Sequence, residues 1–81
     1  MIAIIWTADD CPQCDQAKAE LTAADIPYRE IEAARLVAGE LNNVDAMTQL
    51  AFQGMAAPVI FLAGQYVEAK DLVEFLEKGK R

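Results

Sequence analysis

The sequence predicts an α/β fold with the element order βαβαββα, in which a mixed four-stranded sheet carries helices on both faces. The first observation is a continuous apolar run at residues 2–6, typical of a central strand covered on both sides. The second is a helical stretch at 12–24 followed by a short strand at 28–31. With the first run they form a β-helix-β unit of about 30 residues, the size of a right-handed parallel crossover. The third is an apolar run at 59–62 that turns into a short return strand at 65–67.

The first helix is predicted to begin at Pro12, with Asp10 or Cys11 as its cap. Proline suits the first helical position because it has no N–H to leave unpaired. The residue before Pro27 avoids the helical region, so the helix ends near Ala24. Its inward face is marked by apolar residues with helical spacing, namely Cys14, Ala17, Leu21 and Ala24.

Residues 32–43 carry the weakest pattern. A short helix weakened by Gly39 is expected there, and its apolar face would be formed by Ala33, Leu36, Val37 and Leu41. Asn42 or Asn43 is expected to cap a further helix that ends at Gly54. The inward residues of that helix are predicted to be Val44, Met47, Leu50 and Ala51, with Met47 and Met55 as core filler.

The end of the chain has a clearer pattern. Ala63-Gly64 is typical of a hairpin turn between the last two strands. A last helix is predicted from Ala69 onward, with an apolar stripe formed by Leu72, Phe75 and Leu76. Basic residues gather at its C-terminal end, where the helix dipole favours cations, namely Lys78, Lys80 and Arg81.

Length and charge limit the function classes. The 81 residues allow one domain, spanning 1–81, and 54% of them are hydrophobic, enough for a small single core. The formal net charge of −6 argues against nucleic acid or an anionic membrane surface as a partner. No apolar run approaches the roughly 18 residues of a spanning helix, and no basic region of a signal peptide follows Met1. We therefore expect the protein in the reducing cytoplasm. We also expect it to be a monomer.

The only two cysteines lie in the tetrapeptide Cys11-Pro12-Gln13-Cys14, at the start of the first predicted helix. Two thiols three positions apart on a first helical turn face the same way. The positive end of the helix dipole stabilises a thiolate at Cys11, which makes it the candidate nucleophile. Cys14, one turn further in and better buried, is the candidate resolving thiol. The pair can therefore close and reopen a small disulfide ring.

Other uses of this pair remain open. A structural disulfide is one, although so small a loop gains little stability from closure. A zinc site needs four ligands, and one chain without histidine supplies only half of them. A metal or iron–sulfur cluster bridged between two chains is therefore the metal-binding alternative.

Three features together resemble the glutaredoxins: Trp6-Thr7 followed by the Cys11–Cys14 tetrapeptide, Lys18 in the next helix, and the segment 57–61, Ala-Pro-Val-Ile-Phe. The resemblance covers nearly the whole chain and implies a thioredoxin-like fold. It also implies that Pro58 is cis and faces the cysteines, and that backbone at Ala57 and Pro58 pairs with an extended substrate. Trp6 is expected to pack within a face of the sheet, and Lys18 to assist the thiolate at longer range.

The chain departs from glutathione-dependent members of that family. They usually carry Thr-Val-Pro where Ala56-Ala57-Pro58 stands here, and a Gly-Gly pair where Glu68-Ala69 stands here. The flank before Cys11 is acidic, with Asp9 and Asp10, where such proteins often have a basic residue. Gln13, the second residue between the cysteines, makes the tetrapeptide similar to that of the NrdH-redoxins. Those proteins carry a Trp-Ser-Gly-Phe-Arg-Pro segment near the end, which this chain lacks. The residues that the resemblance offers for glutathione or partner contact are Val59, Glu68, Ala69 and Asp71.

The sequence thus favours a dithiol–disulfide oxidoreductase with Cys11 and Cys14 as catalytic residues and no bound cofactor or metal. Its site would be shaped by Pro12, Gln13, Lys18, Ala57 and Pro58. The resemblance implies a disulfide-containing protein as substrate, with ribonucleotide reductase as the common client of the family. It implies glutathione or thioredoxin reductase as the reductant. The alternatives are a strictly glutathione-dependent deglutathionylating enzyme and a non-catalytic module holding a metal or iron–sulfur cluster between two chains.

Overall fold

The computed structural model describes residues 2–40 and 43–79. Within them four strands form one mixed sheet, in the order β2-β1-β3-β4. β1 and β2 are parallel and β3 with β4 is antiparallel, as the predicted crossover and hairpin require. β1 also pairs with β3, in the antiparallel direction. The strands are β1 (Ala3–Thr7), β2 (Tyr28–Glu32), β3 (Val59–Leu62) and β4 (Gln65–Val67).

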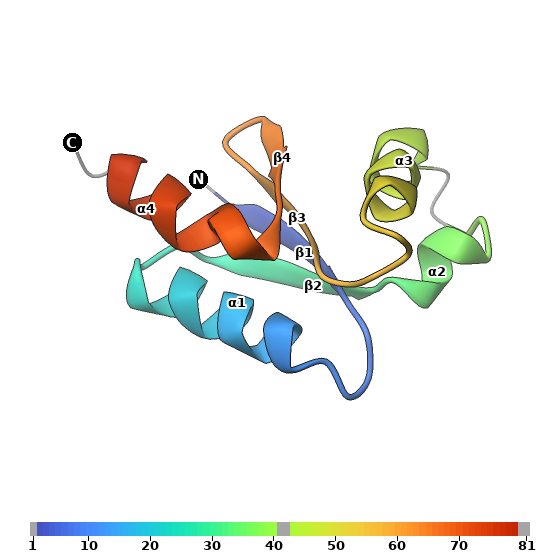
Figure 1. Ribbon diagram of the computed structural model, residues 1–81, viewed down its shortest axis with the longest axis horizontal. Helices are drawn as coiled ribbons and strands as arrows, with labels where there is room; N and C mark the ends of the chain where they lie inside the picture. Colours follow the sequence, from blue (N-terminus) through green and yellow to red (C-terminus); the bar gives the residue numbers. More distant parts are fainter. Residues whose placement is uncertain (1, 41–42, 80–81) are drawn as a thin grey trace.

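Helices cover both faces of this sheet (Figure 1). Two lie together on one face, α1 (Pro12–Ala23) and α4 (Leu72–Gly79), and α4 is preceded by the 3-10 turn η1 (Ala69–Asp71). The shorter α2 (Ala34–Val37) and α3 (Val44–Phe52) lie on the other. The architecture is the thioredoxin-like one that the sequence predicts.

The central strand β1 contributes to a hydrophobic core on each side of the sheet. Its Ile5 packs toward α1 and α4, while the next residue, Trp6, packs toward α2 and α3. Successive strand residues point to opposite faces, so a strand covered on both sides has an uninterrupted apolar sequence. Trp6 is 2% exposed and lies in the sheet face as expected.

Turns and caps explain where the elements end. Ala63 and Gly64 both have positive φ, 54° and 79°, which is the geometry of a tight hairpin turn. Gly54 ends α3 as predicted, because its N–H bonds the Ala51 carbonyl at 3.0 Å in the left-handed conformation (φ 71°). In α4 the predicted stripe is confirmed, since Leu72 is buried and Phe75 and Leu76 pack against the same core.

Gly39 has a different role from the one expected. It follows α2 with φ 78°, and its N–H bonds the Leu36 carbonyl at 3.1 Å, so it terminates the helix instead of weakening its middle. Ala33 and Leu36 are buried as predicted, but Val37 is 57% exposed because the helix ends there. The expectations for Leu41, Asn42, Lys80 and Arg81 lie outside the described residues.

The buried face of α3 was partly mispredicted. The side chain of Asn43 caps the helix by accepting the Ala46 N–H at 3.0 Å. From that start Ala46 and Leu50 point inward with Met47 half-buried beside them, whereas Val44 is 73% exposed. The predictions for Val44 and Ala51 were therefore wrong, since both lie on the solvent side. The prediction for Met55 was wrong too, because it follows the helix in an exposed turn.

Candidate functional site

The two cysteines lie where β1 ends and α1 begins. Cys11 is the N-cap of α1, in extended conformation, and Pro12 is the first helical residue. The cysteines form a disulfide, with their Cα atoms 5.2 Å apart. Cys11 is partly exposed, whereas Cys14 is 1% exposed on the inner side of the helix. The expected difference in access between the two sulfurs is present.

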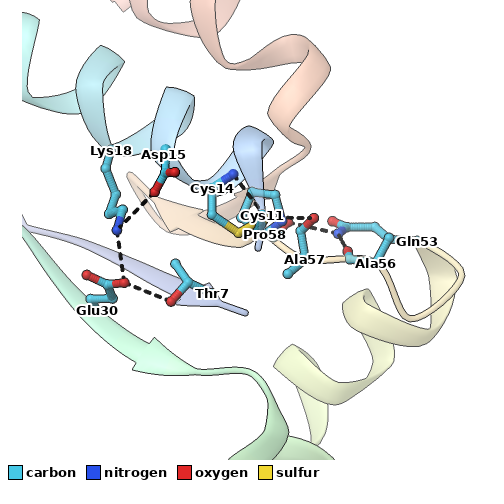
Figure 2. Close-up of a disulfide and its surroundings, with 10 residues drawn as sticks. All are labelled: Thr7, Cys11, Cys14, Asp15, Lys18, Glu30, Gln53, Ala56, Ala57 and Pro58. Atoms are coloured by element: carbon cyan, nitrogen blue, oxygen red, sulfur yellow. Dashed lines mark hydrogen bonds and ion pairs between the residues drawn. A yellow bond between two sulfur atoms is a disulfide. The ribbon is translucent and has the colours of Figure 1, made fainter. Parts of the chain in front are cut away.

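The Cys11 sulfur has two polar neighbours (Figure 2). Its Sγ accepts the backbone N–H of Cys14 at 3.0 Å, one of the N–H groups that a helix start leaves without a helical partner. It also lies 3.8 Å from the carbonyl oxygen of Ala57. A hydrogen bond from an N–H stabilises the thiolate more than the thiol, so the first contact favours the nucleophilic form.

The segment before β3 faces the disulfide. The Ala57–Pro58 bond is cis, as the resemblance implies. Beside it lies a groove of about 200 Å³, which brings together residues far apart in the sequence. Its lining residues are Gln13, Gln53, Ala56, Ala57, Pro58, Glu68, Ala69 and Lys70. The predicted site residues Gln13, Ala57, Pro58, Glu68 and Ala69 therefore meet at one surface.

Two of the residues offered for ligand contact are elsewhere. Val59 has no exposed surface and pairs with Trp6 in the sheet, so its predicted contact with glutathione or a partner is wrong. Asp71 is exposed and lines a neighbouring cavity beside Tyr66 and Phe75. It does not line the groove beside the disulfide.

Lys70 is a groove residue that the sequence reasoning missed. Its Nζ lies 3.3 Å from Oε2 of Glu68, so the carboxylate that stands in place of the family's glycine pair has a cationic partner. The Glu-Ala-Lys order in the segment before α4 was the available signal. The Lys70 side chain is mostly exposed. An ion pair with an exposed partner contributes little to stability but still compensates charge locally.

Gln53 was also missed, and no pattern in the sequence marks it. Its Nε2 donates to the Ala56 carbonyl at 2.8 Å and to the Pro58 carbonyl at 2.9 Å. Its own Oε1 accepts from Nε2 of Gln49 at 2.9 Å. Two side-chain amides therefore connect α3 to the segment that faces Cys11; Figure 2 shows the contacts of Gln53 with that segment.

The other side of Cys11 is acidic. A cavity of about 480 Å³ has Cys11 in its wall. The carboxylates that line it are Asp9, Asp10, Asp15, Glu30 and Glu32. Lys18 also lines this cavity, and its Nζ lies 3.1 Å from Oε2 of Glu30 and 3.6 Å from Oδ1 of Asp15. The charge of the lysine is thus largely compensated, which weakens the long-range assistance to Cys11 that the resemblance implies.

Thr7 links this cavity to the end of β1. Its hydroxyl donates a hydrogen bond to Oε2 of Glu30 at 2.8 Å, and the same oxygen accepts one from Nζ of Lys18 at 3.1 Å. The Thr7 hydroxyl and then the Lys18 ammonium lower the pKa of Glu30 below its ordinary value. In return, the hydrogen bond to Glu30 raises the pKa of Lys18. Glu30 is therefore ionised at neutral pH, and its charge is compensated by Lys18.

Within residues 2–40 and 43–79, no three or more His, Cys, Asp or Glu side chains are grouped so that they could hold a metal ion. No helix in the described part of the chain is long and apolar enough to cross a membrane.

Comparisons with known proteins agree with the fold and the cysteine pair. The Glutaredoxin family model matches residues 3–67. Among solved structures, the chain is similar to the glutaredoxin-like protein NrdH-redoxin from Escherichia coli, with a TM-score of 0.62 and 20% sequence identity. The match covers 96% of this chain and 93% of that chain, which is described as having a thioredoxin-like activity profile. No curated protein sequence matches significantly.

Proposed function

Because the chain belongs to the glutaredoxin family, we propose that it is a dithiol–disulfide oxidoreductase that reduces protein disulfides through Cys11 and Cys14. The observation that carries this proposal is the unequal placement of the two sulfurs. Cys11 is partly exposed at the helix start with an N–H aimed at its Sγ, and Cys14 is buried behind it. A nucleophile needs access to the substrate, whereas a resolving thiol needs access only to the first sulfur.

In the forward reaction the Cys11 thiolate attacks one sulfur of the substrate disulfide. The substrate S–S bond breaks, the leaving thiolate takes a proton, and a mixed disulfide with Cys11 remains. Cys14 then loses its proton and attacks Sγ of Cys11, which releases the second substrate thiol. Two electrons and two protons have passed to the substrate, and the protein is left with the disulfide seen here. An external reductant returns it to the dithiol.

Local charge affects how readily Cys11 ionises. The α1 dipole and the Cys14 N–H favour the thiolate, and both act directly at the sulfur. Asp9 and Asp10 oppose it, but they are exposed and therefore screened by solvent and salt. The net effect is a thiolate favoured less strongly than in a site with a basic neighbour.

We infer that a protein donor such as a thioredoxin reductase reduces the disulfide better than glutathione does. Glutathione presents two carboxylates and one ammonium, and the cavity beside Cys11 is lined with carboxylates. The thioredoxin-like activity profile described for the NrdH-redoxin from Escherichia coli supports this choice. A reducing cytoplasm, no bound cofactor and a disulfide-containing client such as ribonucleotide reductase belong to the same proposal.

The test is NADPH-coupled turnover of a protein disulfide with each donor system. Glutathione with glutathione reductase is compared with thioredoxin reductase at equal protein concentration. Faster turnover with thioredoxin reductase is expected, and Cys11→Ser should show none with either donor. Efficient turnover with glutathione alone would overturn the choice of donor. No turnover with either system and any disulfide would overturn the enzymatic proposal.

One observation favours a glutathione-dependent deglutathionylating activity as the second candidate. Lys70 lines the groove beside Pro58 and gives an anionic ligand one cationic partner next to Glu68. If glutathione binds there, Lys70→Met should lower glutathione-dependent turnover while leaving turnover with thioredoxin reductase unchanged. If the protein donor is the true one, the variant leaves both rates unchanged.

A further inference from the structure

Gln53 lies at the C-terminal end of α3, and all the polar atoms of its side chain have partners. A primary amide has two N–H donors, and here they go to two different carbonyls, those of Ala56 and Pro58. The amide oxygen accepts from Gln49, one helical turn earlier. These partners allow only one orientation of the amide, because the nitrogen must face the two carbonyls.

The two carbonyls lie on either side of a residue whose backbone approaches the reactive sulfur. Between them lies Ala57, whose own carbonyl oxygen is 3.8 Å from Sγ of Cys11. Gln53 therefore holds the segment on both sides of Ala57 without using any polar group of Ala57 itself. The Ala57 backbone faces the disulfide (Figure 2), and Ala57 also lines the groove beside it.

The start of this connection is held by α3, because the N–H groups of Gly54 and Met55 bond the Ala51 and Leu50 carbonyls at 3.0 and 2.8 Å, but its side chains are little buried. Gly54 and Met55 both have positive φ, 71° and 63°, and Met55 is 50% exposed. Ala56 is exposed as well, and burial begins only at Ala57 and Pro58. A segment with few buried apolar contacts opens easily unless polar contacts fix it.

We propose that Gln53 is a positioning residue for the substrate, oriented by Gln49. Its amide fixes the segment 56–58 so that the Ala57 backbone faces Cys11 and can pair with an extended polypeptide. This inference rests on the proposed function. It implies that Gln53 matters for a substrate with a peptide backbone and not for the intrinsic reactivity of the Cys11 sulfur.

The experiment uses pre-reduced protein in single turnover, so that no reductase takes part. Gln53→Met keeps the size of the side chain but removes both donors. It should slow the reduction of insulin disulfides about tenfold, which corresponds to roughly 1.4 kcal/mol, while reduction of Ellman's reagent changes less than about twofold. Gln65→Met, at the exposed first position of β4, is the matched control and should change neither rate.

Gln49 separates positioning from direct substrate contact. It does not line the groove beside the disulfide, so it can act there only through Gln53. Gln49→Met should reduce the insulin rate in the same direction but less, and the double variant should be no slower than Gln53→Met alone. Additive losses, equal losses on both disulfides, or a wild-type insulin rate in Gln53→Met would each overturn the proposal.

A second readout does not depend on activity. The carbonyl carbon resonances of Ala56 and Pro58 should shift in Gln53→Met, and those of residues in β4 should not. Unchanged resonances would show that the amide does not hold the segment. If the wild type reduces neither disulfide while these shifts appear, the proposed function fails and the structural role of Gln53 stands.

Discussion

Cys11 and Cys14 are three residues apart, but their surroundings give them different chemistry. Only Cys11 is reached by both solvent and the helix start, so it alone can attack an external disulfide. Cys11→Ser should therefore reduce disulfide reduction to background. Cys14→Ser should accumulate a mixed disulfide with the substrate, detected by mass spectrometry under non-reducing conditions. A trapped adduct in Cys11→Ser instead would reverse the two roles.

Ala63 is a residue whose backbone conformation suits a different side chain. It has φ 54° at the first position of the β3–β4 turn, and Gly64 follows with φ 79°. Asn-Gly is the preferred pair for such a turn, because asparagine tolerates the left-handed region better than alanine. Ala63→Asn should raise the free energy of unfolding by about 0.5–1 kcal/mol.

Urea denaturation measures this change. Ala19→Asn is the matched control, since Ala19 is exposed within α1, where asparagine should cost roughly 0.5 kcal/mol. Opposite signs for the two substitutions are expected. A loss of stability at both positions would mean that the turn is not in the conformation described.

At the scale of single elements, β1, β2 and α1 are joined by the Thr7–Glu30–Lys18 contacts. The folded-state pKa of Glu30 lies below its ordinary value of 4.5, mainly because of the Thr7 hydroxyl. The unfolded chain therefore binds the Glu30 proton more tightly than the folded one. This contribution to stability is present above about pH 4.5 and is lost as the pH falls through the folded-state pKa.

Thr7→Val removes the main donor to Glu30 and should raise the pKa of its carboxyl toward the ordinary value. Carboxyl resonances followed through an acid titration measure the shift directly. The stability of the variant should also fall less steeply between neutral and acid pH, by a small amount because the carboxylate is largely exposed. Glu30→Gln is the control, and its stability should lack the pH dependence contributed by the Glu30 carboxylate entirely. An unchanged Glu30 titration in Thr7→Val would rule out the hydrogen bond.

The helices show what the sequence could and could not predict. The first strand, α1 and the cysteine pair were predictable because apolar spacing, Pro12 and the next proline mark their limits. The buried face of α3 was not predictable, because this nine-residue helix has apolar residues nearly all round. Which of them point inward is decided by the Asn43 cap and by packing against the sheet. Gln53 and Lys70 escaped notice because their roles depend on contacts made only when the groove assembles.

At the scale of the whole molecule, the net charge of −6 is distributed unevenly around the reactive sulfur. The cavity on one side of Cys11 is lined with carboxylates, including the exposed Asp9 and Asp10. The groove on the other side contains the Glu68–Lys70 ion pair. An anionic reductant such as glutathione meets repulsion mainly from the first side, whereas a protein donor can contribute cations of its own.

Asp9→Asn/Asp10→Asn should therefore improve glutathione as a reductant. The Asp10→Asn change preserves the local backbone, with φ 51°, because asparagine tolerates the left-handed region as aspartate does. Each exposed like-charge contact is worth a few tenths of a kcal/mol to about 1 kcal/mol, so removing two should raise kcat/KM for glutathione roughly threefold to thirtyfold at low salt. The gain should fade as ionic strength rises and the Debye length shortens.

Glu74→Gln/Glu77→Gln on α4 makes the same change in net charge away from the disulfide and should leave kcat/KM unaltered. An equal gain in both double variants would assign the effect to net charge alone. No gain in either would mean that the carboxylates beside Cys11 do not limit glutathione.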